Sequence, residues 1–151
     1  MNMPDRTEGQ SMEQDRALAA LSALANGTRL QIVRFLVGAS HRVGHDGSCA
    51  LATADSPPDA LPAGDIARHV DASASRLSFH LNILEQAGLI AAEKRGRQVL
   101  YRLDRPAMGG LIHYLLDDCC QNDPEVRACC RSRSGDRPPL TLPQGSPRPA
   151  R

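Results

Sequence analysis

The chain has 151 residues, enough for one domain with appendages, and 41% of them are hydrophobic. Because there is no Trp and only two Phe and two Tyr, the core must be aliphatic, which favours a mainly helical protein. The net charge of +1 excludes a nucleic-acid binder that relies on overall positive charge, so any such function needs local basic clusters. The sequence carries neither the apolar segment of a signal peptide nor a run long enough to span a bilayer. We therefore expect a cytoplasmic protein with no membrane contact and with reduced thiols.

The first part of the chain predicts two helices and a long loop. Residues 1–13 are polar and are expected to be disordered. From Glu13 onward, apolar residues recur at helical spacing on one face, at Ala17, Leu18, Leu21, Leu24 and Ala25. Asn26 and Gly27 end this helix, and a second helix follows that Gly38 and Ser40 are expected to end. Residues 39–60 show no period and are expected to form a long flexible loop.

Residues 65–88 predict two helices joined by a turn. A short helix over 65–70 is followed by a turn at Asp71. Ser73 is expected to cap the next helix, because its hydroxyl can accept a hydrogen bond from a free backbone N–H, and Gly88 is expected to end it. The buried stripe of that helix is predicted to be Leu77, Leu81 and Leu84.

A hairpin and a last helix follow. Residues 89–94 and 98–103 predict two strands joined by a tight turn. Asp104 and Pro106 begin a final helix that runs into a pair of cysteines. The predicted fold is therefore mainly α with a two-stranded β wing, a winged helix-turn-helix spanning residues 14–120.

Two groups of residues suit DNA. On the second helix of the helix-turn-helix, the side chains left outside the leucine stripe carry hydroxyl, guanidinium, imidazole and amide groups, at Ser73, Ser75, Arg76, Ser78, Phe79, His80 and Asn82. By itself this pattern also fits the solvated face of an amphipathic helix. The hairpin tip adds basic side chains that could reach flanking phosphates, at Lys94, Arg95 and Arg97. The two groups together favour DNA binding.

Four of the five cysteines lie within residues 117–130, as the pairs Cys119-Cys120 and Cys129-Cys130. Thiolates concentrated in this way bind soft, thiophilic ions or change redox state. Arg127 and Arg131 are expected to lower the thiol pKa values modestly. The tail at 131–151 holds five Pro and is expected to be disordered.

Residues 17–116 resemble the ArsR/SmtB family of metalloregulatory repressors. The resemblance is carried by residues 21–32, by 75–90 with its Ser-Phe-His-Leu run before Ala-Gly-Leu, and by the wing at 94–102. It implies a homodimer that pairs through its first and last helices, binds an imperfect inverted repeat in operator DNA and leaves it when an inducer binds. A Cys-Val-Cys type of metal site, which many members carry in the helix before the recognition helix, is absent from residues 64–70.

The cysteine segment is similar to that of an arsenite-responsive subgroup, in which three C-terminal thiolates bind As(III) within one subunit. The resemblance implies As(III), with Sb(III) as a second inducer, and Cys119 and Cys120 as two of the ligands. Cys129 and Cys130 both remain candidates for the third sulfur, Cys129 through a shorter loop. Zinc or cadmium bound by all four thiolates and a disulfide switch are the alternatives. A thiol enzyme such as an arsenate reductase lacks support, because the chain has no Cys-x-x-Cys after a strand and no Gly-rich phosphate loop.

Overall fold

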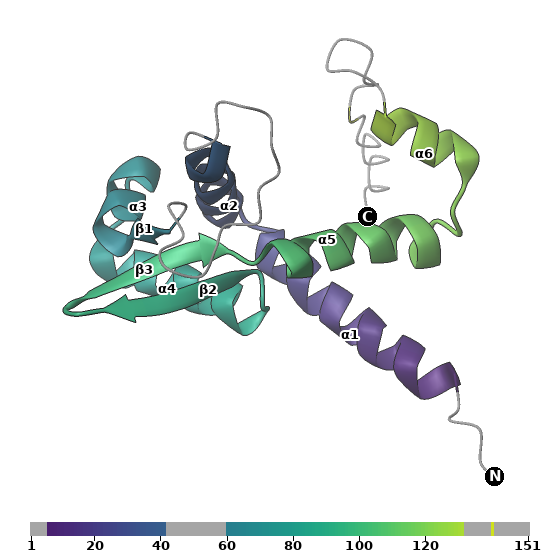
Figure 1. Ribbon diagram of the computed structural model, residues 1–151, viewed down its shortest axis with the longest axis horizontal. Coiled ribbons are helices and arrows are strands. Elements are labelled where there is room, and N and C mark those ends of the chain that lie inside the picture. The colour runs from purple at the N-terminus through teal and green to yellow at the C-terminus, as the bar shows by residue number, and fades with distance from the viewer. Residues whose placement is uncertain (1–5, 42–59, 132–139, 141–151) are drawn as a thin grey trace, which may run out of the picture. The chain divides into compact units, whose positions relative to one another are not determined.

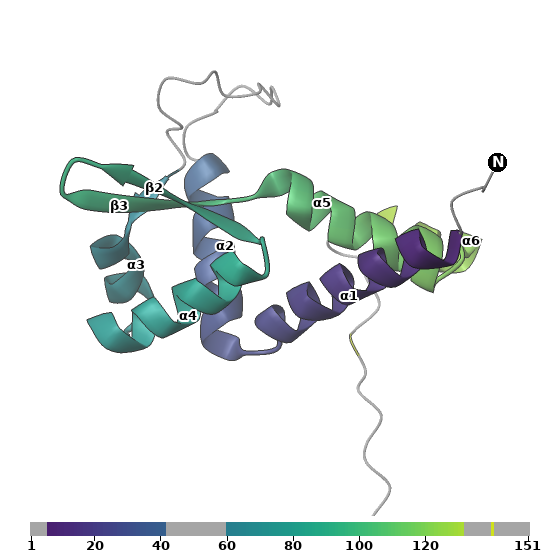
Figure 2. The same ribbon diagram turned by 90° about the horizontal axis from the view of Figure 1, so that it is seen from below.

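The computed structural model describes residues 6–41, 60–131 and 140. The chain divides into two compact units, Met1–Tyr114 and Leu115–Arg151. The described part of the first unit consists of five helices and three strands (Figures 1 and 2): α1 (Arg6–Leu24), α2 (Gly27–His41), β1 (Leu61–Pro62), α3 (Ala63–Val70), α4 (Ala74–Gln86), β2 (Ile90–Arg95), β3 (Gln98–Leu103) and α5 (Arg105–His113).

The core of the first unit is aliphatic, as the composition predicts. Its largest fully buried side chains come from α2, α3, α4 and the start of the hairpin: Ile32, Leu36, Ile66, Leu84 and Leu89. Burial of each side chain of this size stabilises the fold by about 1.5–3 kcal/mol. The predicted stripe of α4 is confirmed, since Leu77, Leu81 and Leu84 are all buried. This packing holds α4 by one face and leaves the other face outward.

The turn geometry around α4 follows from single residues. Asp71 ends α3 in the left-handed conformation, with φ of 51°. The Ser73 hydroxyl accepts a hydrogen bond from the Arg76 backbone N–H at 3.4 Å, so the predicted cap is confirmed. Gly88, with φ of 76°, ends the helix, and the N–H of Leu89 donates to the carbonyl of Leu84 at 3.0 Å. This is the glycine-ended arrangement that satisfies the last free carbonyls of a helix.

The wing is a sheet of three strands in the order β1-β3-β2. β2 and β3 pair antiparallel from Ile90↔Leu103 to Arg95↔Gln98, and Gly96 supplies a positive φ of 59° in the two-residue turn. The winged helix-turn-helix prediction is confirmed, but the sequence analysis missed β1. Its two residues, Leu61 and Pro62, pair with β3 and are too few to show the alternation that predicts a strand.

Two predicted boundaries in the first third of the chain are wrong. α1 begins at Arg6, so residues 6–13, which we expected to be disordered, are helical. Glu, Gln, Met and Arg form helices well without an apolar stripe, and such a segment is missed when only periodicity is used. α2 continues through Gly38 to His41, because one glycine weakens a helix without ending it. Residues 1–5 and 42–59, including most of the predicted loop, lie outside the described residues.

The face of α1 that packs inward is made of alanines. Ala17, Ala20 and Ala23 are buried, whereas Leu18 and Leu21 are 55% and 38% exposed. The face predicted from spacing is therefore largely wrong: of its residues only Ala17 is buried, Leu24 is half-buried, and Leu18, Leu21 and Ala25 are exposed. Among the described residues, no helix is both long and apolar enough to cross a membrane.

The second unit begins within a π-helical turn, η1 (Tyr114–Cys119), and continues into α6 (Pro124–Arg131). Gln121 and Asn122 have φ of 49° and 59° in the connection between them. The Asp123 carboxylate then caps α6, since it accepts hydrogen bonds from the backbone N–H groups of Glu125 and Val126. The segment between Cys120 and Cys129, which we expected to be a loop, is therefore helical from Pro124 onward, and Cys129 and Cys130 both lie on α6. Apart from Leu140, the tail beyond Arg131 lies outside the described residues.

Candidate functional site

Six of the seven residues that the sequence predicted for DNA contact lie on α4, and the seventh, Ser73, is its N-cap. The side chains are exposed except for that of His80, which is half-buried: Ser73, Ser75, Arg76, Ser78, Phe79, His80 and Asn82. They gather opposite the buried leucine stripe because the helix repeats every 3.6 residues. Their role in binding DNA stays a prediction.

A shallow depression of about 330 Å³ lies on this face, lined by Ser75, Arg76, Phe79 and His80. Phe79 is 61% exposed, and its ring meets the His80 ring edge-on, with centroids 5.6 Å apart. An exposed phenyl ring, a guanidinium and an imidazole together offer apolar contact to a thymine methyl group and hydrogen bonds to base edges. The face therefore has the chemistry of direct base contact.

Arg29, at the start of α2, contacts the His80 ring. Its Nε donates to the carbonyl of Ala23, and its Nη1 lies 3.3 Å from His80 Nδ1. Since a guanidinium only donates, Nδ1 must accept, and the imidazole is neutral with its proton on Nε2. Burial, then the charges of Arg29 and Arg76, lower the pKa of His80, which agrees with a neutral ring.

Arg29 belongs to this surface but was not predicted from the sequence. Arg29 lies 51 residues from His80, and no local spacing connects the two residues. The one feature of the sequence that could have indicated its role is its position at the start of a helix. The positive end of the helix dipole disfavours a cation there unless that cation has a partner.

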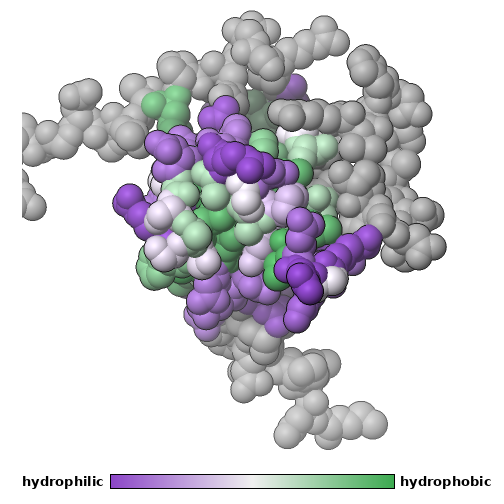
Figure 3. Space-filling model, turned by 90° about the vertical axis from the view of Figure 1, so that its left-hand side faces the viewer, coloured by the Kyte–Doolittle hydropathy of each residue, from purple (hydrophilic) through white to green (hydrophobic). Residues whose placement is uncertain are grey.

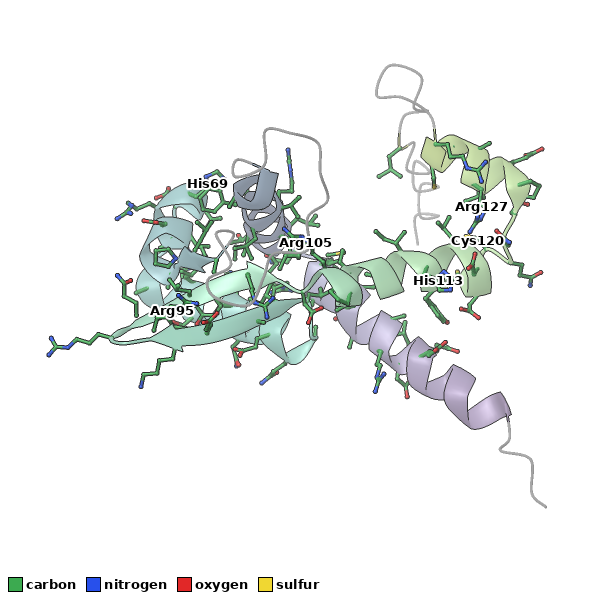
Figure 4. All side chains as sticks on the ribbon, viewed as in Figure 1. His69, Arg95, Arg105, His113, Cys120 and Arg127 are labelled. Carbon is green, nitrogen blue, oxygen red and sulfur yellow. The ribbon has the colours of Figure 1, made fainter. Side chains whose placement is uncertain are left out.

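The wing tip exposes Lys94, Arg95 and Arg97, as predicted. Arg95 is not wholly available, because its Nη2 and Nε both lie 2.9 Å from the Glu93 carboxylate (Figure 4 labels Arg95). Viewed from the side of the wing (Figure 3), hydrophilic side chains surround a more apolar centre on the described surface. Contact of these cations with phosphate remains a prediction.

The cysteine pairs lie in the second unit, Cys119 and Cys120 where η1 ends and Cys129 and Cys130 near the end of α6. All four thiols are free, and only that of Cys120 is half-buried. Loss of hydration raises the pKa of Cys120, with further contributions from Cys119, Asp123 and Cys130. The expected lowering of thiol pKa values by Arg127 is wrong for Cys120. The Arg127 guanidinium is bound instead to Asp117, 3.0 Å away.

Within the described residues, no three His, Cys, Asp or Glu side chains stand close enough to hold a metal ion. The donor chemistry nevertheless fits a soft ion, because the four cysteines of this unit are free thiols and thiolates prefer such ions to hard ones. The cysteine side chains predicted as ligands must therefore move closer together before they can bind one ion.

Comparison with known proteins identifies relatives of the first unit. A helix-turn-helix domain family matches residues 24–92. The transcriptional repressor SdpR of Bacillus subtilis (strain 168) is 33% identical over 66 residues, which are 44% of this chain and 73% of SdpR.

Two solved structures share the fold. An ArsR-like transcriptional regulator from Rhodococcus sp. RHA1 is 21% identical with a TM-score of 0.53, covering 76% of this chain and 90% of its own. A homodimeric winged helix-turn-helix DNA-binding domain from Mycobacterium bovis, described as that of a possible ArsR-family regulator, is 21% identical with a TM-score of 0.50. It covers 83% of this chain and 94% of its own.

Proposed function

Because the chain belongs to the ArsR family of winged-helix transcriptional regulators, we propose that it is an arsenic-responsive repressor of the cytoplasm. A homodimer binds operator DNA and releases it when As(III), or Sb(III), is bound by thiolates of residues 117–130. The observation that carries the proposal is that four free thiols follow α5 within seventeen residues of sequence in a chain with a helix-turn-helix fold. The thiol-enzyme alternative fails, because the family consists of regulators rather than enzymes.

The homodimer is supported by apolar side chains that the first unit leaves uncovered. Leu18 of α1 and Ile112 of α5 are 55% and 51% exposed, and both helices extend away from the wing (Figures 1 and 2). Large exposed apolar side chains on one part of a surface are typical of a protein interface. A second copy would bury them, and the Mycobacterium bovis relative is itself homodimeric.

The DNA contact follows from the face of α4. In a helix-turn-helix the second helix lies in the major groove with its N-terminal residues at base edges, which assigns Ser75, Arg76 and His80 to bases. The wing cations Lys94 and Arg97 then contact phosphates beside the groove. Binding should weaken steeply with salt, because each phosphate contact releases counterions.

The chemistry of arsenic distinguishes this inducer from zinc. Arsenous acid condenses with three thiols, so that three As–S bonds replace three As–O bonds and three waters leave, with no net release of protons. Zinc or cadmium binds thiolates, and each coordinated thiol loses a proton to the solvent. A buffered calorimetric titration that detects no proton release with arsenite and clear release with zinc separates the two modes.

An electrophoretic mobility shift tests the proposal, using the purified chain and an operator fragment that the chain itself selects from random-sequence DNA. Arsenite should release the wild-type protein. Cys119→Ser and Cys120→Ser should bind the DNA normally and stay bound in arsenite.

Arg76→Ala is the matched control, because it should lose DNA while it still binds arsenite. Normal release of both serine variants would remove the cysteine segment from the proposal. Release of the wild type by hydrogen peroxide but not by arsenite would favour a disulfide switch between the cysteine pairs.

A further inference from the structure

The two candidates for a third sulfur lie on different faces of α6. Successive residues of an α-helix are rotated by about 100°, so residues three apart share a face and residues two apart do not. Cys130 is three residues from Arg127, whereas Cys129 is two residues from it. The direction in which Arg127 points therefore decides which cysteine faces the first pair.

Arg127 points back to the π-helical turn. Its Nη2 donates to Asp117 at 3.0 Å, and the two side chains are only 35% and 29% exposed. Its Nε is buried and has no hydrogen-bond partner. In Figure 4 the side chain of Arg127 extends from α6 toward the end of η1, where Cys120 is labelled. The Arg127 face of α6 is thus the face directed at Cys119 and Cys120.

The segment that leads from Cys120 into α6 is also held by hydrogen bonds. Asp123 Oδ1 accepts hydrogen bonds from the N–H groups of Glu125 at 2.9 Å and Val126 at 3.0 Å. The carbonyl of Asp123 also accepts a hydrogen bond from the backbone N–H of Arg127 at 3.0 Å. The backbone N–H of Cys120 donates to the carbonyl of Leu115, and the backbone N–H of Asp123 donates to the carbonyl of Cys120. The connection between the two cysteine pairs is therefore short and hydrogen-bonded.

We propose that the third sulfur of the inducer site is Cys130, and that the Asp117–Arg127 ion pair is the positioning pair that holds α6 with Cys130 toward Cys119 and Cys120. The inference rests on the proposed function. Cys129 stays in solvent and is not a ligand. Binding brings the Cys130 sulfur inward by side-chain rotation and a small shift of a helix that has no buried residue.

The ligand choice is tested by arsenic X-ray absorption and arsenite titration of the full-length protein and two variants. The wild type and Cys129→Ser should both show three sulfurs per arsenic with equal affinity. Cys130→Ser should show two sulfurs and lose more than the roughly 10–100-fold affinity that outer-shell changes remove.

The converse result, with three sulfurs kept in Cys130→Ser and lost in Cys129→Ser, would overturn the inference and leave the proposed function intact. A wild type that binds no arsenite would instead overturn the proposed function. Operator binding by each variant, measured without arsenite, reports that it is folded.

The positioning pair is tested by Arg127→Ala, with Arg131→Ala as the matched control on the same helix. Arg127→Ala should keep three sulfurs per arsenic but bind arsenite about tenfold more weakly, because Cys130 must now be ordered by the ligand alone. The exchange of Asp117→Arg with Arg127→Asp should restore the affinity. Unchanged affinity in Arg127→Ala, or loss in the control of the same size, would contradict the positioning role.

Discussion

The two units differ in what holds them together. In the first unit, side chains such as Ile32, Leu36 and Leu84 are fully removed from solvent. Among the described residues of the second unit, 115–131 and 140, none is buried, and an ion pair, a helix cap and a few backbone hydrogen bonds hold η1 and α6. A cap contributes about 1 kcal/mol, and a partly exposed ion pair contributes about 1 kcal/mol or less. The packed core of the first unit therefore resists a change of conformation, whereas the thiol-bearing unit can change its conformation at low energetic cost.

The largest effect should come from truncation within the core of the first unit. Leu84→Ala removes a fully buried side chain from α4 and should lower the free energy of unfolding by about 2–5 kcal/mol. Val126→Ala in α6, where the side chain is 39% exposed, should change it by about 0.5 kcal/mol or less. Urea denaturation followed by circular dichroism measures both. If both variants lost the same free energy of unfolding, the two units would not differ in how tightly they are packed.

Arg76→Ala should weaken operator binding by about 1–3 kcal/mol without changing the unfolding midpoint, because Arg76 is exposed on the outer face of α4. Fluorescence anisotropy at several salt concentrations measures this loss. Lys94→Ala should act differently, weakening all sequences alike and reducing the salt slope by about one. If Arg76→Ala left affinity for the selected operator unchanged, α4 would not be the recognition helix.

Asp123→Ala should destabilise α6 by about 1 kcal/mol, because two backbone N–H groups lose their acceptor. The effect should be local: hydrogen exchange should speed up at residues 124–131, while the midpoint of global unfolding and the DNA affinity stay the same. A fall in the global midpoint would mean that α6 is part of the packed structure.

Arg29→Ala should raise the pKa of His80, because one of the two cations that lower it and the hydrogen bond to Nδ1 are removed. The sign also fixes the effect on stability. A depressed His pKa stabilises the fold above the ordinary value of 6.5 and this contribution is lost as the pH falls below it, so the variant should lose less stability on acidification. An NMR titration of the His80 ring measures the pKa, with Arg34→Ala, an exposed arginine of the same helix, as the control.

The sequence predicted those elements whose residues act locally. The leucine stripe of α4, the Ser73 cap and the glycine at 88 each lie next to what they determine, and all are confirmed. The sequence did not predict β1, because two residues show no period, or α6, because an eight-residue helix that begins with a proline and has no buried residue is too short to show a clear helical period. The Arg29–His80 contact and the Asp117–Arg127 pair join residues 51 and 10 positions apart, and only the folded chain brings them together.

Reciprocal linkage tests most directly the claim that arsenite bound in the thiol-bearing unit releases DNA held by the first unit. If arsenite lowers operator affinity by some factor, operator must lower arsenite affinity by the same factor. The measurement is the arsenite dissociation constant of the wild-type dimer, free and saturated with its selected operator. The account predicts weaker arsenite binding in the operator complex, by the factor found in the release assay. Equal arsenite affinity with and without operator would contradict it.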